Sequence, residues 1–126
     1  MAYAFEFIPN PRRGVVTINM SGFFLDDAIP LIATGMADAL RKLNCGPNQH
    51  MTLIDVTGCQ IQTQHIVGAF QKLVTNPMFR SRRLAVVVGS SLIKMQIRRI
   101  ISDDSYARIF DNHSAAEAWL SQTEFA

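Results

Sequence analysis

Alternating hydrophobic and polar residues at the start of the chain predict two β-strands joined by a turn. Aromatic side chains occupy every second position over residues 3–8, and residues 15–20 alternate in the same way. A period of two sends successive side chains to opposite faces of a strand. The intervening segment, 9–14, holds two prolines and a glycine, which favour a chain reversal. The chain is therefore expected to open with an antiparallel hairpin.

Four later segments have the pattern of α-helices. Apolar residues recur every three or four positions over 25–43 and 63–75, the spacing that gives a helix one buried face. Two further helices are predicted over 92–102 and 115–122. Together these segments alternate with the predicted strands, and the longest of them is the best defined.

Residues that favour helix starts stand in front of three of these segments. The Asp26–Asp27 pair and the Ser90–Ser91 pair can each accept hydrogen bonds from free amides of a first turn. Ser114 with Glu117 has the spacing of a capping box before the last helix. We expect these residues to cap their helices.

Three short apolar runs, 51–56, 84–88 and 106–110, are better explained as buried strands than as helices. The order of elements is then β-β-α-β-α-β-α-β-α. Alternating strands and helices call for a parallel sheet with right-handed crossovers. The predicted fold class is α/β: a mostly parallel five-stranded sheet, antiparallel at its N-terminal strand, packed with four helices.

Length and composition restrict the class of protein. The chain has 126 residues, 48% of them hydrophobic and 17% charged, with a net charge of +2. These values favour one folded domain over 1–126 and exclude intrinsic disorder. The two cysteines, Cys45 and Cys59, are too few for a disulfide framework. With no leader pattern and no apolar run long enough for a membrane span, we expect a cytoplasmic protein.

Charge is distributed unevenly along the chain. Residues 80–108 hold seven basic and two acidic residues, Asp103 and Asp104, so their net charge is 7 − 2 = +5. The rest holds five basic and eight acidic residues, 5 − 8 = −3. We expect the basic segment to form one side of the molecule and to favour a partner with carboxylates or phosphates. The alternative is a set of scattered surface charges.

Motifs for catalysis or metal binding are missing. His50, His65 and His113 are far apart in the sequence, and no HExxH, CxxC or GxSxG pattern occurs. Cys59 follows the predicted end of a strand, where a loop thiol would be exposed. We expect surface or hydrogen-bonded histidines, no metal, no cofactor and no enzymatic activity.

Polar residues near the carboxyl ends of two predicted strands are candidate ligand-binding residues. Asp55 and Thr57 belong to one strand end, Gly89 and Ser90 to the next. Ligands of parallel α/β sheets bind at this edge, and a helix N-terminus after a glycine offers free amides to an anion. The alternatives are a structural aspartate and an ordinary strand-to-helix turn.

The helix predicted over 92–102 has apolar residues outside its core stripe. Its isoleucines share one face, whereas Leu92 and Met95 lie beside Arg99, and Lys94 and Arg98 lie on another side. Exposed apolar residues rimmed by arginine are typical of a protein-contact surface. The alternatives are a broad core stripe and contact with a neighbouring helix.

The order of elements and four segments resemble the STAS domain, specifically the SpoIIAA-like group of small stand-alone STAS/SEC14-type proteins. The matching segments are VVTINMSGFF, LIDVTG, LAVVVG and YARIFDNHSAAEAWL. The last is similar to that group's ending, in which a strand ends in Phe and the helix carries Glu-Ala-x-Trp-Leu. The resemblance covers nearly the whole chain and implies a regulatory or ligand-binding scaffold.

Anti-sigma factor antagonists of this fold carry an Asp-Ser-Ser-Gly box whose serine is phosphorylated by a partner kinase. Asp55 and Thr57 match the residues that lead to the box, but the box itself falls on 63–66, which is Thr-Gln-His-Ile. The phospho-acceptor serine and the glycine are absent, so we expect the usual phosphoserine switch to be missing.

The leading hypothesis is therefore a non-catalytic regulatory or protein-interaction module of the STAS/SpoIIAA-like type. It would bind a protein partner, or a second copy of the chain, through the 61–70 segment and the helix at 91–102. The expected interface residues are Thr63, His65, Leu92, Met95, Arg98 and Arg99.

The alternative hypothesis is a site for a small apolar or anionic ligand, lipid- or nucleotide-like, between the sheet and the helices, with Asp55, Thr57, Gly89 and Ser90 at the strand ends. The apolar, methionine-bearing interior and the resemblance to SEC14-type proteins favour it. Nucleic acid is a less favoured partner, because the basic segment has no aromatic platform and the net charge is small.

Overall fold

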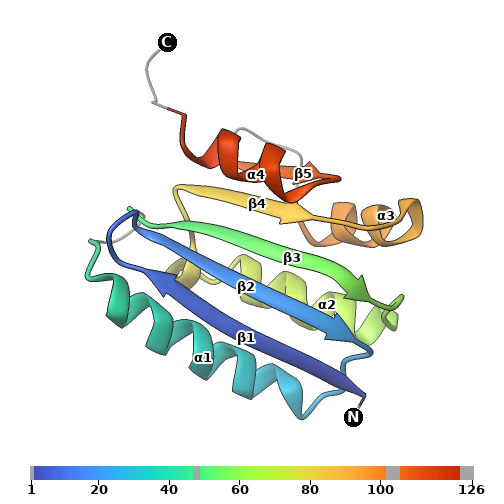
Figure 1. The fold of residues 1–126 in the computed structure, drawn as a ribbon. Helices are drawn as coiled ribbons and strands as arrows, with labels where there is room; N and C mark the ends of the chain where they lie inside the picture. Colours follow the sequence, from blue (N-terminus) through green and yellow to red (C-terminus); the bar gives the residue numbers. More distant parts are fainter. Residues whose placement is uncertain (1, 47–48, 102–105, 123–126) are drawn as a thin grey trace.

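Within residues 2–46, 49–101 and 106–122, which the computed structural model describes, five strands form one sheet in chain order (Figure 1). The strands are β1 (Tyr3–Asn10), β2 (Val15–Gly22), β3 (Met51–Cys59), β4 (Arg83–Val87) and β5 (Ala107–Phe110). The helices of the same residues are α1 (Ala28–Leu43), α2 (Gln64–Val74), α3 (Ser91–Ile100), α4 (His113–Leu120) and a short 3₁₀ helix, Pro77–Phe79.

The sheet has the predicted mixed topology. β1 pairs with β2 in antiparallel orientation, with Phe7 opposite Ile18, and lies at one edge. β2, β3, β4 and β5 are parallel to one another. The predicted α/β class, with a mostly parallel five-stranded sheet and an antiparallel N-terminal strand, is therefore confirmed.

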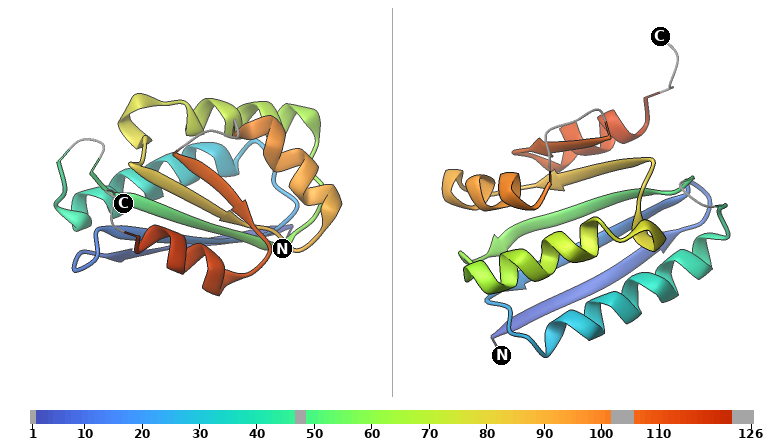
Figure 2. Two further views of the ribbon diagram at one scale, coloured as in Figure 1. Left: turned by 90° about the horizontal axis from the view of Figure 1, so that it is seen from above. Right: turned by 180° about the vertical axis from the view of Figure 1, so that it is seen from behind.

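Chain order in the sheet decides where the helices lie. Each of α1, α2 and α3 connects a strand to the next parallel strand in the same direction, and right-handed crossovers of this kind fall on one face. Figure 2 shows these three helices on one side of the sheet and α4 alone on the other. The molecule thus has a three-helix face and an α4 face.

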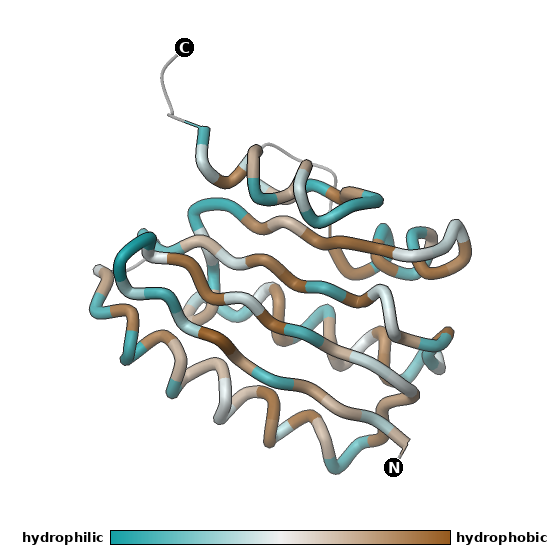
Figure 3. Tube along the Cα trace, viewed as in Figure 1, coloured by the Kyte–Doolittle hydropathy of each residue, from teal (hydrophilic) through white to brown (hydrophobic). Residues whose placement is uncertain are grey.

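The α4 face is packed around one tryptophan. Trp119 lies 5.7 Å from Phe110 between ring centroids. Alternate residues of the central strands complete this part of the core: Val15, Met51, Leu53, Ala85 and Val87, with Ala116 and Leu120 from α4. β4 is covered on both faces, and its residues are hydrophobic along most of its length. In β1, by contrast, hydrophobic and polar or small residues alternate (Figure 3).

Two predicted caps are wrong. Asp27 stands at the start of α1 but makes no capping bond, because its own backbone is already helical (φ −65°, ψ −20°) and a capping residue is extended. Asp27 instead accepts a hydrogen bond from the Tyr3 hydroxyl, 3.2 Å away. At α4, the extended Asn112 is the cap, with its Oδ1 2.8 Å from the amide nitrogen of Ala115.

Glu117, the other half of the predicted capping box, has a different role. Its Oε2 lies 2.8 Å from Arg13 Nη1, which ties the β1–β2 turn to α4. Ser90 caps α3, as predicted. Thr63 is the cap of α2. Asp103 and Asp104 lie outside the described residues.

β3 is longer than the 51–56 predicted. Pairing with β2 continues to Gly22 and Cys59 beyond a local register shift, so three residues expected in a loop are in the strand. Cys59 is consequently half-buried in the strand, and the prediction of an exposed loop thiol at this position is wrong.

Candidate functional site

The structure brings together the two segments that were expected to bind a partner. The amide nitrogen of Gln62, in the loop before α2, lies 2.8 Å from Gln96 Oε1, and Gln96 Nε2 lies 2.7 Å from the Gln62 carbonyl. These reciprocal bonds fix the loop against α3. They also place Ile61, the neighbour of Gln62 in the chain, close to one side of α3.

Three large apolar side chains are exposed at this junction. The exposed fractions of Ile61, Leu92 and Met95 are 49%, 59% and 56%. Leu92, Met95 and Arg99 follow one another at spacings of three and four, so they share one flank of α3. Leu92 and Met95 are therefore not part of a broad core stripe.

Two predicted interface residues of α2 have intramolecular partners. The Thr63 hydroxyl oxygen accepts a hydrogen bond from the amide of Ile66, 3.2 Å away, and so caps the helix. His65 Nε2 lies 2.6 Å from Asp26 Oδ1, and both side chains are exposed. The pair joins the first turn of α2 to the segment before α1.

The predicted basic side of the molecule is divided by the fold. Arg83 donates hydrogen bonds to the carbonyls of Trp119 and Gln122, at 2.7 and 3.0 Å, and so belongs to the α4 face. The guanidinium of Arg108 stacks on the Trp119 ring. Alternation along β4 and β5 points these arginines to the α4 face, and at the β5 edge Arg108 also meets Lys94 and Arg98 of α3.

Arg98 and Arg99 consequently face different surroundings. Lys94, Arg98 and Arg108 line a shallow hollow beside Ile109 at the β5 edge of the sheet. Arg99 lies with Leu92 and Met95 on the flank near the α2 loop. Of the six predicted interface residues, Leu92, Met95 and Arg99 share one flank of α3, and Arg98 lies on the opposite flank. Thr63 follows Gln62, the loop residue that is bonded to α3, whereas His65 is paired with Asp26 in the segment before α1.

The four predicted ligand residues have local structural roles. Asp55 Oδ1 accepts hydrogen bonds from the amide and the hydroxyl of Thr57, at 2.9 and 2.7 Å. Gly89 packs against Thr57, because a Cβ built on it would lie 3.2 Å from the Thr57 carbonyl oxygen. The Ser90 hydroxyl caps α3. Asp55, Thr57 and Gly89 do come together, and their binding of a ligand stays a prediction.

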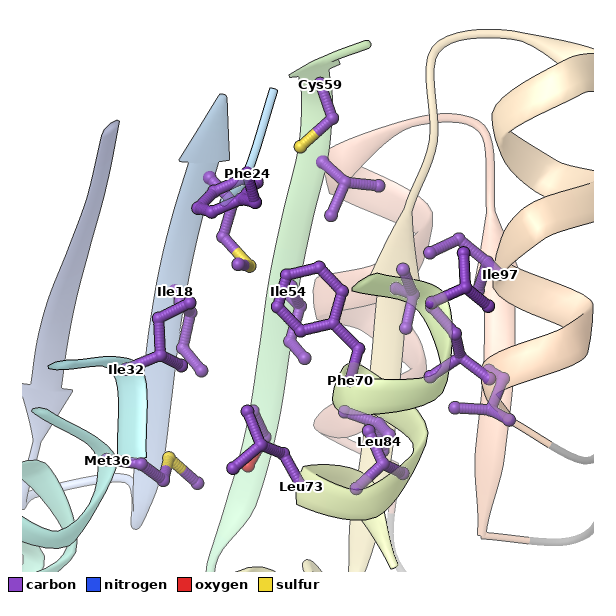
Figure 4. A pocket seen from close by; sticks show the side chains of 18 of the residues that line it. Ile18, Phe24, Ile32, Met36, Ile54, Cys59, Phe70, Leu73, Leu84 and Ile97 are labelled. Carbon is purple, nitrogen blue, oxygen red and sulfur yellow. The ribbon is translucent and has the colours of Figure 1, made fainter. Parts of the chain in front are cut away.

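A cavity lies between the sheet and the helices of the three-helix face, where the alternative hypothesis from the sequence placed a ligand. Its volume is about 140 Å³. Figure 4 shows side chains of α1, α2, α3 and the strands pointing into it. Those labelled include Ile32 and Met36 from α1, Phe70 and Leu73 from α2, Ile97 from α3, and Ile18, Ile54 and Leu84 from the sheet. The predicted ligand residues Asp55, Thr57, Gly89 and Ser90 do not line it.

The cavity has polar groups near the amino ends of β3 and β4. Thr52 Oγ1 lies 2.6 Å from Ser81 Oγ, which lies 3.2 Å from His50 Nε2. Burial of the imidazole lowers the pKa of His50 below its ordinary 6.5, and a hydrogen bond with the backbone of Phe79 opposes this shift. The neutral ring can then accept a hydrogen bond from the Ser81 hydroxyl. His50 is thus a hydrogen-bonded histidine, which is one of the two kinds, surface or hydrogen-bonded, that the sequence led us to expect.

Cys59 lines the same cavity near the carboxyl ends of the strands. Burial, with a smaller contribution from the Asp55 carboxylate, raises the pKa of this thiol to about 11. Because the thiolate is the nucleophilic form, Cys59 is poorly suited to covalent catalysis at neutral pH. Cys45 is free and exposed.

The described residues include neither a metal-binding cluster nor a membrane-spanning helix. No three His, Cys, Asp or Glu side chains in this part of the chain are arranged to hold a metal ion. None of the described helices has the length and apolar character needed to cross a membrane.

Comparison with known proteins identifies the fold. No protein-family model matches the sequence, and no curated protein matches it either. A Shewanella loihica protein of the DUF3478 family, described as having a SpoIIAA-like fold, superposes with a TM-score of 0.69 at 15% identity, over 94% of each chain. An anti-sigma factor antagonist from Mycobacterium paratuberculosis gives a TM-score of 0.58 at 10% identity, over 94% of this chain and 96% of that one.

These two likenesses confirm the fold expected from the sequence resemblance. The chain has the SpoIIAA-like fold of STAS domains, with the β-β-α-β-α-β-α-β-α order. At such low identity the comparisons concern the fold, and fold alone is a weak basis for assigning function.

Proposed function

We propose that the protein is a non-catalytic regulatory module that binds an acidic partner protein at its α2–α3 surface. We define this surface by Ile61, Thr63, His65, Leu92, Met95 and Arg99. The observation that carries the proposal is the group of three exposed apolar side chains at the hydrogen-bonded junction of the α2 loop and α3.

The chemistry of the surface suits a protein partner. An apolar centre bordered by polar and arginine side chains is the usual arrangement of a protein interface. The loop is held by Gln62 and Gln96, so little conformational entropy would be lost on binding. Arg99 on this flank, with Lys94 and Arg98 on the other, favours carboxylates on the partner. One structural neighbour is named an anti-sigma factor antagonist, which supports a regulatory role.

Regulation of this binding would differ from a phosphoserine switch. The position of the box begins at Thr63, whose hydroxyl is occupied as the cap of α2, and no serine follows within 63–66. We expect the partner to bind the unmodified chain.

The test is affinity capture from a native lysate with purified wild-type protein and the double variant Arg98→Glu/Arg99→Glu. The proposal expects captured partners to be lost with this variant. The matched control, Arg12→Glu/Lys42→Glu, has the same change of charge at exposed residues far from the surface and should keep them. The single variants then assign the loss to one flank of α3. An identical set of partners in all samples would contradict the proposal.

A second candidate function is small-molecule binding, and the apolar cavity between the sheet and the three-helix face favours it. Native mass spectrometry of freshly purified protein should then show extra mass that is lost on denaturation. A spectrum of bare protein, with no thermal shift across lipid and nucleotide panels, would contradict this candidate.

A further inference from the structure

The cavity is lined almost entirely by carbon and sulfur. Strands β2, β3 and β4 supply its floor, and α1, α2 and α3 supply its roof (Figure 4). No Asp, Glu, Lys or Arg is among the described residues that line it. We infer that the cavity is a binding site for an uncharged, hydrocarbon-like molecule the size of a single aromatic ring or a short alkyl chain. This inference rests on the second candidate function and specifies its ligand.

Size and polarity argue for such a ligand. Protein interiors are close-packed, and voids larger than a water molecule are few. The volume of about 140 Å³ is close to that of an engineered apolar cavity of roughly 150 Å³, which stays dry and takes up benzene or xenon. Water gains little in a cavity that offers few hydrogen bonds. A hydrocarbon gains dispersion contacts on all sides.

The polar groups at the wall of the cavity already have partners. The Gln62 side chain accepts from the Phe24 amide at 2.7 Å and donates to the Gly22 carbonyl at 2.9 Å. The amide of Gln96 is paired with the Gln62 backbone. At the other end, Thr52 and Ser81 are bonded to each other. In the described residues no buried side-chain nitrogen or oxygen lacks a hydrogen-bond partner.

A ligand with a carboxylate or phosphate placed among the apolar lining residues would therefore lose its hydration without gaining a counter-charge. Burial of an unpaired charge is far more costly than burial of a neutral group. The cavity thus selects hydrocarbon over fatty-acid anions and nucleotides, and narrows the apolar-or-anionic ligand expected from the sequence to the apolar kind.

Cys59 offers a built-in reporter of occupancy. Its side chain lines the cavity near the ends of β2 and β3 (Figure 4), so a ligand in the cavity would cover the sulfur. Cys45, exposed and outside the lining residues, serves as an internal control in the same molecule. Since the pKa of Cys59 is raised, its reaction is slow at neutral pH, and each thiol is compared only with itself.

The experiment uses the full chain with toluene as probe and benzoate as its charged counterpart. Saturation-transfer NMR should show binding of toluene and no binding of benzoate. Toluene should slow the modification of Cys59 by methyl methanethiosulfonate at least threefold and leave the rate at Cys45 unchanged. Ala33→Leu, which adds carbon atoms at the cavity wall, should abolish both effects. Ala118→Leu makes the same change at an exposed site of α4 and should preserve them.

Circular dichroism melting shows whether Ala33→Leu is folded; if it is not, Val86→Ile, which adds one methyl group at the cavity floor, takes its place. The inference is overturned if toluene gives no transfer and no protection, or if protection survives the filling variants. Benzoate binding without toluene binding would leave small-molecule binding intact and refute the hydrocarbon ligand. Toluene binding by protein with a bare native mass spectrum would support the hydrocarbon site and show that the protein is purified with this site empty.

Discussion

Single polar residues hold together parts of the molecule that are distant in the sequence. Gln62 is the clearest example, because its side chain bonds to the Phe24 amide and the Gly22 carbonyl at the end of the β1–β2 hairpin, while its backbone bonds to Gln96 of α3. Phe24 is fully buried. A buried amide that loses its acceptor costs about 1–3 kcal/mol, so this residue matters for stability as well as for the α2–α3 surface.

We predict that Gln62→Met lowers the free energy of unfolding by about 2 kcal/mol, since the Phe24 amide would lose its acceptor. Urea denaturation followed by fluorescence of Trp119 measures the effect. Gln60→Met, at an exposed neighbouring position, should change stability by less than about 0.5 kcal/mol. Equal effects of the two changes would show that the side-chain bonds of Gln62 are unimportant.

His50 is predicted to make stability depend on pH. Its pKa is lowered in the folded protein, so below pH 6.5 the unfolded chain binds more protons than the folded one at this residue. The contribution of neutral His50 to the free energy of unfolding is therefore complete above pH 6.5, and it is lost as the pH falls toward the pKa of His50 in the folded protein. Urea titrations should show that the free energy of unfolding falls less between pH 7.5 and pH 5 in His50→Gln than in the wild type. The exposed control His113→Gln should behave as the wild type.

At the scale of elements, the two faces of the sheet are packed differently. α4 covers its face with a compact group around Trp119, whereas α1, α2 and α3 enclose the cavity against theirs. The empty volume of about 140 Å³ leaves its lining side chains without the dispersion contacts of a filled interior. This is the physical reason why a ligand that fills the three-helix face would also stabilise the protein.

Caps give a second test at this scale, because sequence and structure disagree about α4. We predict that Asn112→Ala lowers the free energy of unfolding by about 1 kcal/mol, since the Ala115 amide loses its cap. Ser114→Ala, at the cap position indicated by the sequence, should change it by less than about 0.5 kcal/mol. Chemical denaturation of both variants decides between the two assignments, and a reversed order would restore the capping box.

At the scale of the whole molecule, the distribution of charge bears on the choice of partner. An interface between two copies related by a twofold axis would bring the same patch of each copy together. On the α2–α3 surface, a twofold axis close to Arg99 would place Arg99 of one copy near Arg99 of the other, and α3 itself (Ser91–Ile100) holds no carboxylate that could compensate. We therefore favour an acidic partner over a second copy.

We predict that the protein sediments as a monomer in sedimentation velocity at low salt. Any self-association should strengthen when salt screens the arginines. A dimer that forms at low salt, and that dissociates on Leu92→Ser/Met95→Ser, would show instead that the partner is a second copy of the chain.

The sequence by itself determined the order of elements, the antiparallel first strand and the α/β class, because periodicity of two or of three to four residues depends only on local chain geometry. It also identified Leu92 and Met95 as apolar residues outside the core stripe of α3. Helix starts were less certain, since several neighbouring polar residues can cap and backbone conformation selects among them, as at Asp27 and Asn112.

The tertiary structure decided which distant residues meet. Pairing of Gln62 with Gln96, and of His65 with Asp26, depends on packing of α1, α2 and α3 side by side. The sequence could not indicate that Arg83 and Arg108 turn to the α4 face, or that His50, Thr52 and Ser81 form one buried group. The sequence suggested a ligand between the sheet and the helices, but it could not give the size or the lining of a cavity there. Hydrophobic spacing shows which side chains face the interior, and only the distance between sheet and helices shows whether they fill it.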